Sequence, residues 1–253
     1  MKAQLRNIIN FSVKKELAYR QHKPSPILFD HLPKCAGLTI IQYLLTQYPQ
    51  RVTYITDERK PSKSAKKFKS LSVESRHGYH LVVGHCTHQL LDYVHPDSIK
   101  LTIFRDPIER IISHYFFVKQ YKRHYLHQKI VESNMSLEDY ATSELSCELR
   151  NFYISHFSGL LADEINLNPE KSVERAVSVL EQYDVIGFQD DLTSAMNKLQ
   201  NLAHLCQPFE DRVFNKTRNK KTVEEIPTKT KKSIAQANSL DVELYNRLKT
   251  RKA

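Results

Sequence analysis

The sequence has no long apolar run and few cysteines. None of its 253 residues belongs to an uninterrupted run of 18 or more apolar residues, so we expect no segment that spans a bilayer. The cysteines are Cys35, Cys86, Cys147 and Cys206. They lie far apart, and no two of them have the Cys-x-x-Cys spacing. They therefore predict reduced thiols in a reducing compartment instead of a disulfide framework.

The N-terminus lacks the pattern of a secretory signal. Its only apolar cluster before Lys23 consists of Leu5, Ile8, Ile9 and Phe11, and no small-residue cleavage site follows. We interpret residues 1–26 as a basic extension. The sequence favours a bacterial protein of the cytoplasm, with a membrane-peripheral location or a chain trimmed at its N-terminus as alternatives.

Length and composition favour one α/β domain over residues 27–253. A chain of 253 residues with 40% hydrophobic content can bury a sizeable core, and it is too apolar to be disordered. Apolar runs predict strands at Ile27–Phe29, Val52–Ile55, Leu81–Val83, Leu101–Phe104 and Val185–Phe188. Helical spacing predicts helices at Leu38–Tyr48, from Pro107 onward, and at Leu149–Phe157, Val173–Tyr183, Leu192–Leu205 and Ser233–Leu248. Alternating strands and helices predict a P-loop-like parallel sheet with helices on both faces.

The formal net charge is +10 at pH 7, and the positive charge is concentrated in two stretches that we expect to be loops, Arg59–Ser70 and Asn215–Lys232. Such stretches are either solvated faces or attract a polyanionic partner. Nucleic acid is not expected as that partner. The two stretches lack interleaved aromatic residues, and the chain has no helix-turn-helix, zinc-finger or RNA-binding motif.

A first anion-binding motif follows the first strand. The segment Leu32–Thr39 reads Leu-Pro-Lys-Cys-Ala-Gly-Leu-Thr and leads directly into a predicted helix. The backbone N–H groups at such a helix opening favour an anion. Lys34 would place a mobile positive charge beside it.

A second motif, Phe104–Arg110, follows the fourth strand. Asp106, Pro107 and Glu109 have the spacing of a helix N-cap, a proline at the first helical position and a capping-box glutamate. Arg105 is then left at the mouth of the helix. Ser113 falls two turns further in, off the apolar stripe formed by Ile108, Ile111, Ile112, Tyr115 and Phe116.

Together these motifs resemble the carbohydrate sulfotransferases that use 3′-phosphoadenosine 5′-phosphosulfate (PAPS), of the heparan sulfate 2-O- and chondroitin type. Three further segments extend the resemblance, in order, over roughly Ile27 to Leu248. They are Val83-Gly84-His85, Asn215-Lys216-Thr217-Arg218 and the segment Asn238–Tyr245, which reads Asn-Ser-Leu-Asp-Val-Glu-Leu-Tyr. The resemblance implies that residues 27–253 are a sulfotransferase domain that moves a sulfuryl group from PAPS to a hydroxyl of a carbohydrate or glycoconjugate.

The resemblance also implies how the site works. Lys34 is expected to stabilise the departing phosphate. The amides expected to hold the 5′-phosphate are those of Cys35, Ala36, Gly37, Leu38 and Thr39. His85 is the expected catalytic base, because a neutral imidazole can accept the hydroxyl proton near pH 7. Its rivals among nearby histidines are His77, His80, His88 and His95.

The 3′-phosphate is expected to lie at the second motif. Arg105 offers a charged fork and Ser113 a hydroxyl, with Thr217 and Arg218 closing over the phosphate. No metal is expected, since a sulfuryl group needs no metal clamp. The short run of His85, Cys86 and His88 also lacks the two spaced ligand pairs of a structural zinc site.

Two alternatives remain at this stage. A kinase or nucleotide hydrolase is disfavoured because the chain has no Gly-x-x-x-x-Gly-Lys-Ser/Thr motif. A non-catalytic basic module that binds acidic glycans would keep the fold without the activity. For the enzyme, the expected acceptor is a glycan or glycolipid of undefined identity, acidic if the basic stretches attract it. The sequence leaves the oligomeric state open.

Overall fold

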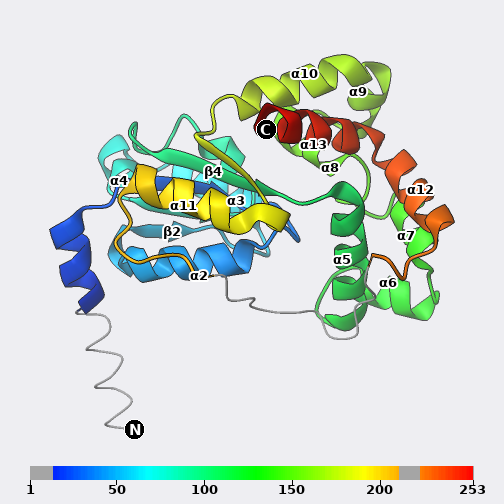
Figure 1. Ribbon diagram of the computed structural model, residues 1–253, viewed down its shortest axis with the longest axis horizontal. Helices are drawn as coiled ribbons and strands as arrows, with labels where there is room; N and C mark the ends of the chain where they lie inside the picture. The colour runs from blue at the N-terminus through cyan, green and yellow to red at the C-terminus, as the bar shows by residue number, and fades with distance from the viewer. Residues whose placement is uncertain (1–13, 211–222, 253) are drawn as a thin grey trace, which may run out of the picture. The chain divides into compact units, whose positions relative to one another are not determined.

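The computed structural model describes residues 14–210 and 223–252, which fall into two compact units (Figure 1). Unit 1 contains residues 14–104 and 183–210, and unit 2 contains residues 105–182 and 223–252. Each unit has its own buried hydrophobic cluster. The two halves of each unit are far apart in the sequence, so each unit is completed only when the chain returns to it.

Unit 1 is built on a sheet of five parallel strands in the order β2-β3-β1-β4-β5. The strands are β1 (Ile27–Asp30), β2 (Thr53–Ile55), β3 (Leu81–Gly84), β4 (Ile99–Phe104) and β5 (Val185–Phe188). The α/β class and the parallel sheet expected from the sequence are therefore confirmed. All four residues of β1 and of β3 are buried, as the continuous apolar runs of a covered parallel sheet require.

Helices flank the sheet. Those of unit 1 are α2 (Gly37–Gln47), α3 (Pro61–Lys69), α4 (Val73–His77) and α11 (Leu192–Ala203), with short 3-10 helices η1 (Gln50–Val52), η2 (Thr87–Leu90) and η3 (Gln189–Asp191). Both α2 and α11 lie on one face of the sheet, where Ile40 and Leu199 join the core cluster (Figure 1). Residues 14–22 are also helical. Tyr19, from the expected extension, packs into the same core.

Helix α3 corrects one expectation. Arg59–Ser70 was expected to be a loop because it is rich in lysine, but most of it is helical. Pro61 occupies the first helical position, and Ala65 and Phe68, three residues apart, are both fully buried. Helix α3 therefore buries two apolar side chains on one face, while its exposed faces carry lysines.

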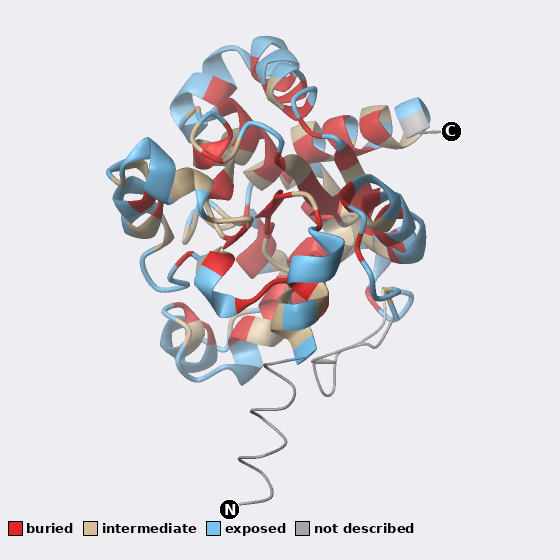
Figure 2. Ribbon diagram, turned by 90° about the vertical axis from the view of Figure 1, so that its left-hand side faces the viewer, coloured by how far each residue is buried: buried red, intermediate tan, exposed pale blue. Residues whose placement is uncertain are grey.

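Unit 2 is helical. Its helices are α5 (Pro107–Gln120), α6 (His127–Glu132), α7 (Leu137–Thr142), α8 (Phe152–Ser158), α9 (Ala162–Leu167), α10 (Pro169–Leu180), α12 (Thr228–Ala237) and α13 (Ser239–Lys252). Ile111 and Ile112 of the predicted α5 stripe are buried in its core, together with Tyr140 and Ile234. Figure 2 shows the buried residues on the strands and on the inward faces of the helices.

The C-terminal region differs from the single helix expected over Ser233–Leu248. Two helices, α12 and α13, meet at Asn238, which is fully buried and not helical. Its amide group donates to the Ile234 carbonyl and accepts from the Asn151 N–H, at 3.1 Å each. The side chain therefore satisfies backbone groups at the break, which is the local competition that makes asparagine a helix terminator.

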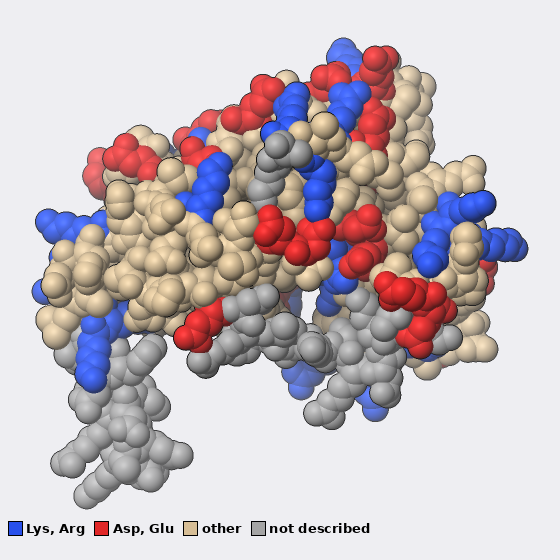
Figure 3. Space-filling model, viewed as in Figure 1, with Lys and Arg blue, Asp and Glu red and all other residues tan. Residues whose placement is uncertain are grey.

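No helix in the described ranges combines the length and the apolar character needed to cross a membrane. On the face seen in Figure 3, acidic and basic side chains lie side by side over α10 and α13. Arg247, for example, pairs with both Glu174 and Glu243. Ion pairs therefore offset part of the positive charge that these two helices carry.

Candidate functional site

The topology of unit 1 points to the carboxyl end of β1. After β1 the chain runs out to β2, returns through β3, and then crosses to β4 on the other side of β1. Ligands of open α/β sheets bind at such a switch point, beyond the carboxyl ends of the strands. The Lys34 loop follows β1 and His85 follows β3, so both expected catalytic residues lie at this edge of the sheet.

The Lys34 loop has an unusual backbone. Lys34 and Ala36 both adopt left-handed conformations, with φ of 68° and 62°. Such conformations are costly in residues other than glycine, and alternating handedness turns successive N–H groups toward one side as an anion-binding nest. Within the described chain, the amides of Ala36, Gly37 and Leu38 have no hydrogen-bond acceptor. The opening of α2 therefore offers three N–H groups to a ligand.

The other two amides expected at the phosphate are already engaged. The Cys35 N–H donates to the Leu32 carbonyl at 3.3 Å, and the Thr39 N–H donates to the Ala36 carbonyl at 3.1 Å. The Cys35 thiol is buried and donates to the Pro33 carbonyl at 3.5 Å. Among the five amides expected at the phosphate, those without an acceptor in the described residues are therefore the three between Cys35 and Thr39.

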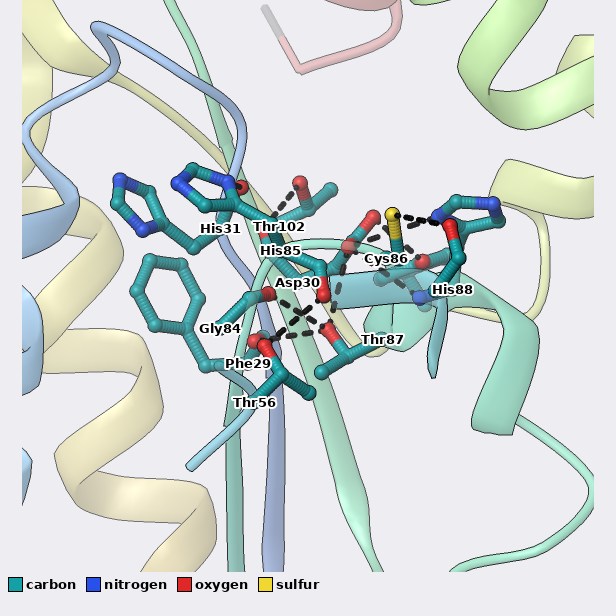
Figure 4. Close-up of polar contacts among 12 residues, drawn as sticks. Phe29, Asp30, His31, Thr56, Gly84, His85, Cys86, Thr87, His88 and Thr102 are labelled. Carbon is teal, nitrogen blue, oxygen red and sulfur yellow. Dashed lines mark hydrogen bonds and ion pairs between the residues drawn. The ribbon is translucent and has the colours of Figure 1, made fainter. Parts of the chain in front are cut away.

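His85 is held in one orientation. Its Nδ1 lies 2.7 Å from the carbonyl oxygen of His31 (Figure 4). Because a carbonyl can only accept, we assign the proton to Nδ1, which leaves Nε2 of the neutral ring as the acceptor. The half-buried His85 also has its own carbonyl fixed by the Thr56 hydroxyl at 3.0 Å. The ring therefore has the tautomer that a general base requires.

His31 stacks on this ring, a contact that the sequence did not reveal. The two ring centroids are 4.3 Å apart with 22° between the planes. Burial, and to a smaller extent the neighbouring His85, lowers the pKa of His31 to about 3, so His31 is neutral at pH 7. A Cβ atom on Gly37 would lie 1.8 Å from the His31 ring. The motif glycine thus makes room for the histidine that supports His85.

A second glycine makes room at the end of β3. Gly84 has φ of 129°, a conformation that other residues rarely adopt, and a Cβ there would lie 2.1 Å from the Thr56 hydroxyl. This is the same hydroxyl that holds the His85 carbonyl. A residue with a side chain at position 84 would therefore displace the hydroxyl that holds the His85 carbonyl, which explains why a glycine precedes His85.

Asp30 anchors the loops beneath these rings. Its fully buried carboxylate accepts hydrogen bonds from the Thr87 hydroxyl, the His88 N–H and the Tyr183 hydroxyl, each at 3.2 Å. Burial raises the pKa of Tyr183 well above its usual value, and the Asp30 carboxylate raises it further. Asp30 thus ties together the ends of β1 and β3 and the approach to β5.

The four other histidines considered as the base, His77, His80, His88 and His95, either lie away from the carboxyl end of β3 or contact Asp30. His80 precedes β3 and so lies at the opposite, amino end of the strand from His85. The rings of His77 and His95 pack near it, His95 at 5.9 Å from His80 and 5.5 Å from His77. His88 lies beside Asp30. The geometry therefore separates His85 from three of its four rivals.

In unit 2, the Asp106 cap has the predicted form. Its carboxylate accepts from the N–H groups of Ile108 and Glu109, at 2.9 and 3.0 Å. The expected capping-box role of Glu109 is different in the structure. Its carboxylate lies 2.8 Å from Nη2 of Arg105, so the glutamate pairs with the arginine in place of the cap.

Glu109 and Ser113 are four residues apart on one face of α5, and Arg105 pairs with Glu109 from just before the helix. The Arg105 side chain is 14% exposed, and Ser113 is 5% exposed, so the hydroxyl is not a surface group. Thr217 and Arg218 lie outside the described residues. The second expected anion site is therefore defined by Arg105 and Ser113 alone.

Comparison with known proteins agrees with the sequence motifs. A family model described as the sulfotransferase family matches residues 18–246. A search of curated proteins gave no match. The matched range covers most of the chain and includes Lys34, His85, Arg105 and Ser113. The chain therefore belongs to the sulfotransferase family.

Proposed function

We propose that this protein transfers a sulfuryl group from PAPS to a hydroxyl of a carbohydrate or glycoconjugate. Bound PAPS supplies the activated sulfuryl group. The Ala36–Leu38 amides bind its 5′-phosphate, and Lys34 neutralises the charge that grows there as the bond to sulfur breaks. Nε2 of His85 accepts the proton of the acceptor hydroxyl while the oxygen attacks in line.

The observation that carries this proposal is the bond between His85 Nδ1 and the His31 carbonyl. A histidine that merely fills space at a strand end needs no fixed tautomer. Here the proton is assigned to Nδ1, the support ring beneath it is neutral, and the lone pair of Nε2 remains available. These are the properties that a general base needs.

Arg105 and Ser113 are proposed to bind the 3′-phosphate. A guanidinium fork that is 14% exposed is well suited to a charge-assisted contact with a phosphate. The Glu109 carboxylate now pairs with this guanidinium, so a 3′-phosphate would compete for it. Thr217 and Arg218 are proposed to close over the cofactor, as the family motif implies.

The acceptor is proposed to be acidic. Helix α3 follows β2 at the carboxyl edge and packs against η2, directly after His85. The Ser62 hydroxyl lies 3.7 Å from the Cys86 thiol, which places the start of this helix beside the base. Lys63, Lys66 and Lys67 are exposed on it. A glycan with carboxylate or sulfate groups would be attracted to this face.

Binding and transfer assays with the full chain test the proposal. We expect 3′,5′-ADP to bind without magnesium, and labelled sulfate to pass from PAPS to an acidic glycan. Lys34→Ala should abolish transfer and keep the fold. His85→Ala should lower kcat about 10²- to 10⁴-fold at nearly unchanged 3′,5′-ADP affinity. Magnesium-dependent ATP binding would instead indicate a kinase, and glycan binding without nucleotide binding a non-catalytic module.

The expected cytoplasmic location stays a prediction. Fractionation of the source cells, followed by detection of the protein in the soluble, membrane and exported fractions, tests it. The oligomeric state can be measured in the same preparation.

A further inference from the structure

The two backbone groups of Arg105 share one partner. The Tyr153 hydroxyl donates to the Arg105 carbonyl at 2.8 Å and accepts from the Arg105 N–H at 3.2 Å. Arg105 stands between the last residue of β4 and the N-cap of α5, so neither a strand ladder nor a helix supplies these bonds. Buried backbone groups require partners, and here a single side chain provides both.

Tyr153 is itself fixed from a distant part of the chain. It lies in the first turn of α8 and is fully buried. The Asp241 carboxylate, from α13, accepts from the N–H groups of Tyr153 and Ile154, at 3.0 Å each. Asn151, the residue before α8, is left-handed and caps no N–H of its own helix. Asp241 therefore does the capping that the local sequence omits.

The connection between α8 and α13 is reciprocal. The Asn151 amide oxygen accepts from the Leu240 N–H at 3.1 Å, while the Asn238 amide oxygen accepts from the Asn151 N–H at 3.1 Å. Each helix start is thus capped by a side chain of the other. A displacement of α13 would move the first turn of α8, and with it the Tyr153 hydroxyl.

Arg110 completes this cluster. It is fully buried, donates to the Glu148 carbonyl at 2.8 Å, and lies over the rings of Phe152 and Tyr153 at 5.0 and 5.3 Å. Burial raises the pKa of Asp241 to about 6, although the Arg110 charge opposes this shift. Arg110 thereby links α5 to the same two helices that hold Tyr153.

We propose that Tyr153 is a positioning residue for Arg105, and that Asp241 acts through it, so that α13 sets the backbone from which the arginine binds the 3′-phosphate. This role rests on the proposed function. It assigns Tyr153 and Asp241 to cofactor selection, although neither is proposed to touch the cofactor.

The test is a comparison of two nucleotides that differ only in the 3′-phosphate. The affinities of the full chain for 3′,5′-ADP and 5′-AMP are measured by titration calorimetry. Tyr153→Phe removes only the hydroxyl, and we expect it to lower the preference for 3′,5′-ADP about tenfold, with little change in 5′-AMP affinity. In an Arg105→Ala background the same substitution should leave the remaining preference unchanged, because its effect passes through Arg105.

The matched control is Tyr140→Phe. Tyr140 is also fully buried in unit 2, and its hydroxyl bonds to Nδ1 of His114 at 2.7 Å. This variant loses a buried hydroxyl contact of the same kind without touching Arg105. It should lower thermal stability and keep the preference for 3′,5′-ADP, which separates positioning from a general loss of stability.

Asp241→Asn provides a second test if Tyr153→Phe does not fold. An asparagine offers only one oxygen to the two N–H groups, so we expect a three- to tenfold loss of the same preference. A wild-type preference that survives these variants would overturn the positioning role alone. A wild-type protein that binds both nucleotides equally would overturn the proposed function, and the positioning role with it.

Discussion

Gly37 and His31 are in a contact that admits no side chain between them. A Cβ atom on Gly37 would lie 1.8 Å from Cδ2 and 1.9 Å from Nε2 of the His31 ring. The glycine of the phosphate loop therefore also determines where the ring that stacks on His85 can lie. The loop and the proposed base are coupled through this one contact.

This coupling predicts the effect of Gly37→Ala. The added methyl group should displace His31 and tilt His85, so we expect at least a tenfold lower kcat and a loss of about 1–3 kcal/mol in unfolding free energy. Transfer assays and denaturant unfolding measure the two effects. Gly78→Ala is the control, because a Cβ there would meet its nearest atom at 3.4 Å. Unchanged turnover in the Gly37 variant would separate His31 from catalysis.

Arg105 and Glu109 predict opposite effects on nucleotide binding. Arg105→Ala removes the charged fork and should weaken 3′,5′-ADP binding by about 2 kcal/mol. Glu109→Gln removes the carboxylate that pairs with the fork and would repel a phosphate. We expect it to strengthen binding by up to about 1 kcal/mol. Calorimetry with 3′,5′-ADP and 5′-AMP measures both, and a change that is equal for the two nucleotides would contradict a 3′-phosphate contact.

His31 predicts a pH dependence of stability. Its pKa is about 3 in the folded chain and 6.5 in its unperturbed state. As the pH falls from 6.5 toward 3, the unfolded chain binds a proton that the folded chain does not, so stability falls by up to about 1.4 kcal/mol per pH unit. His31→Phe keeps an aromatic ring in the stack and removes this titration.

Denaturant unfolding of the wild type and His31→Phe between pH 4 and pH 7 checks this dependence. The wild type should lose stability relative to the variant as the pH falls. Parallel stability profiles would show that His31 is not buried as a neutral ring.

The lysines of α3 predict an effect on the acceptor and not on the donor. Lys63→Glu and Lys67→Glu should raise KM for an acidic glycan severalfold and leave KM for PAPS nearly unchanged. The effect should shrink as ionic strength rises, because these side chains are exposed. Lys171→Glu, an equal charge reversal on α10, is the control. If all three variants raised KM for the glycan equally, the effect would come from the net charge of the protein and not from the position of α3.

Much of the fold was accessible from the sequence because its signals are local. The strands were expected within two residues of their observed bounds, since each is a short apolar run between polar segments. The Asp106 cap was expected for the same reason. Helix α3 was missed because its pattern rests on Ala65 and Phe68 alone, and the break at Asn238 was missed because its partner, Asn151, is 87 residues away.

The candidate site likewise has features that the sequence alone reveals and contacts that only the folded structure reveals. By itself, the sequence determined that the Lys34 loop follows one buried strand, that His85 follows a second, and that Arg105 follows a third, just before the Asp106 cap. Chain order and residue spacing record these facts. Only the tertiary structure decided that the His31 carbonyl orients His85 and that Tyr153 holds Arg105. Those bonds join residues 54 and 48 positions apart, and no periodicity or spacing rule links positions that meet only when the chain folds.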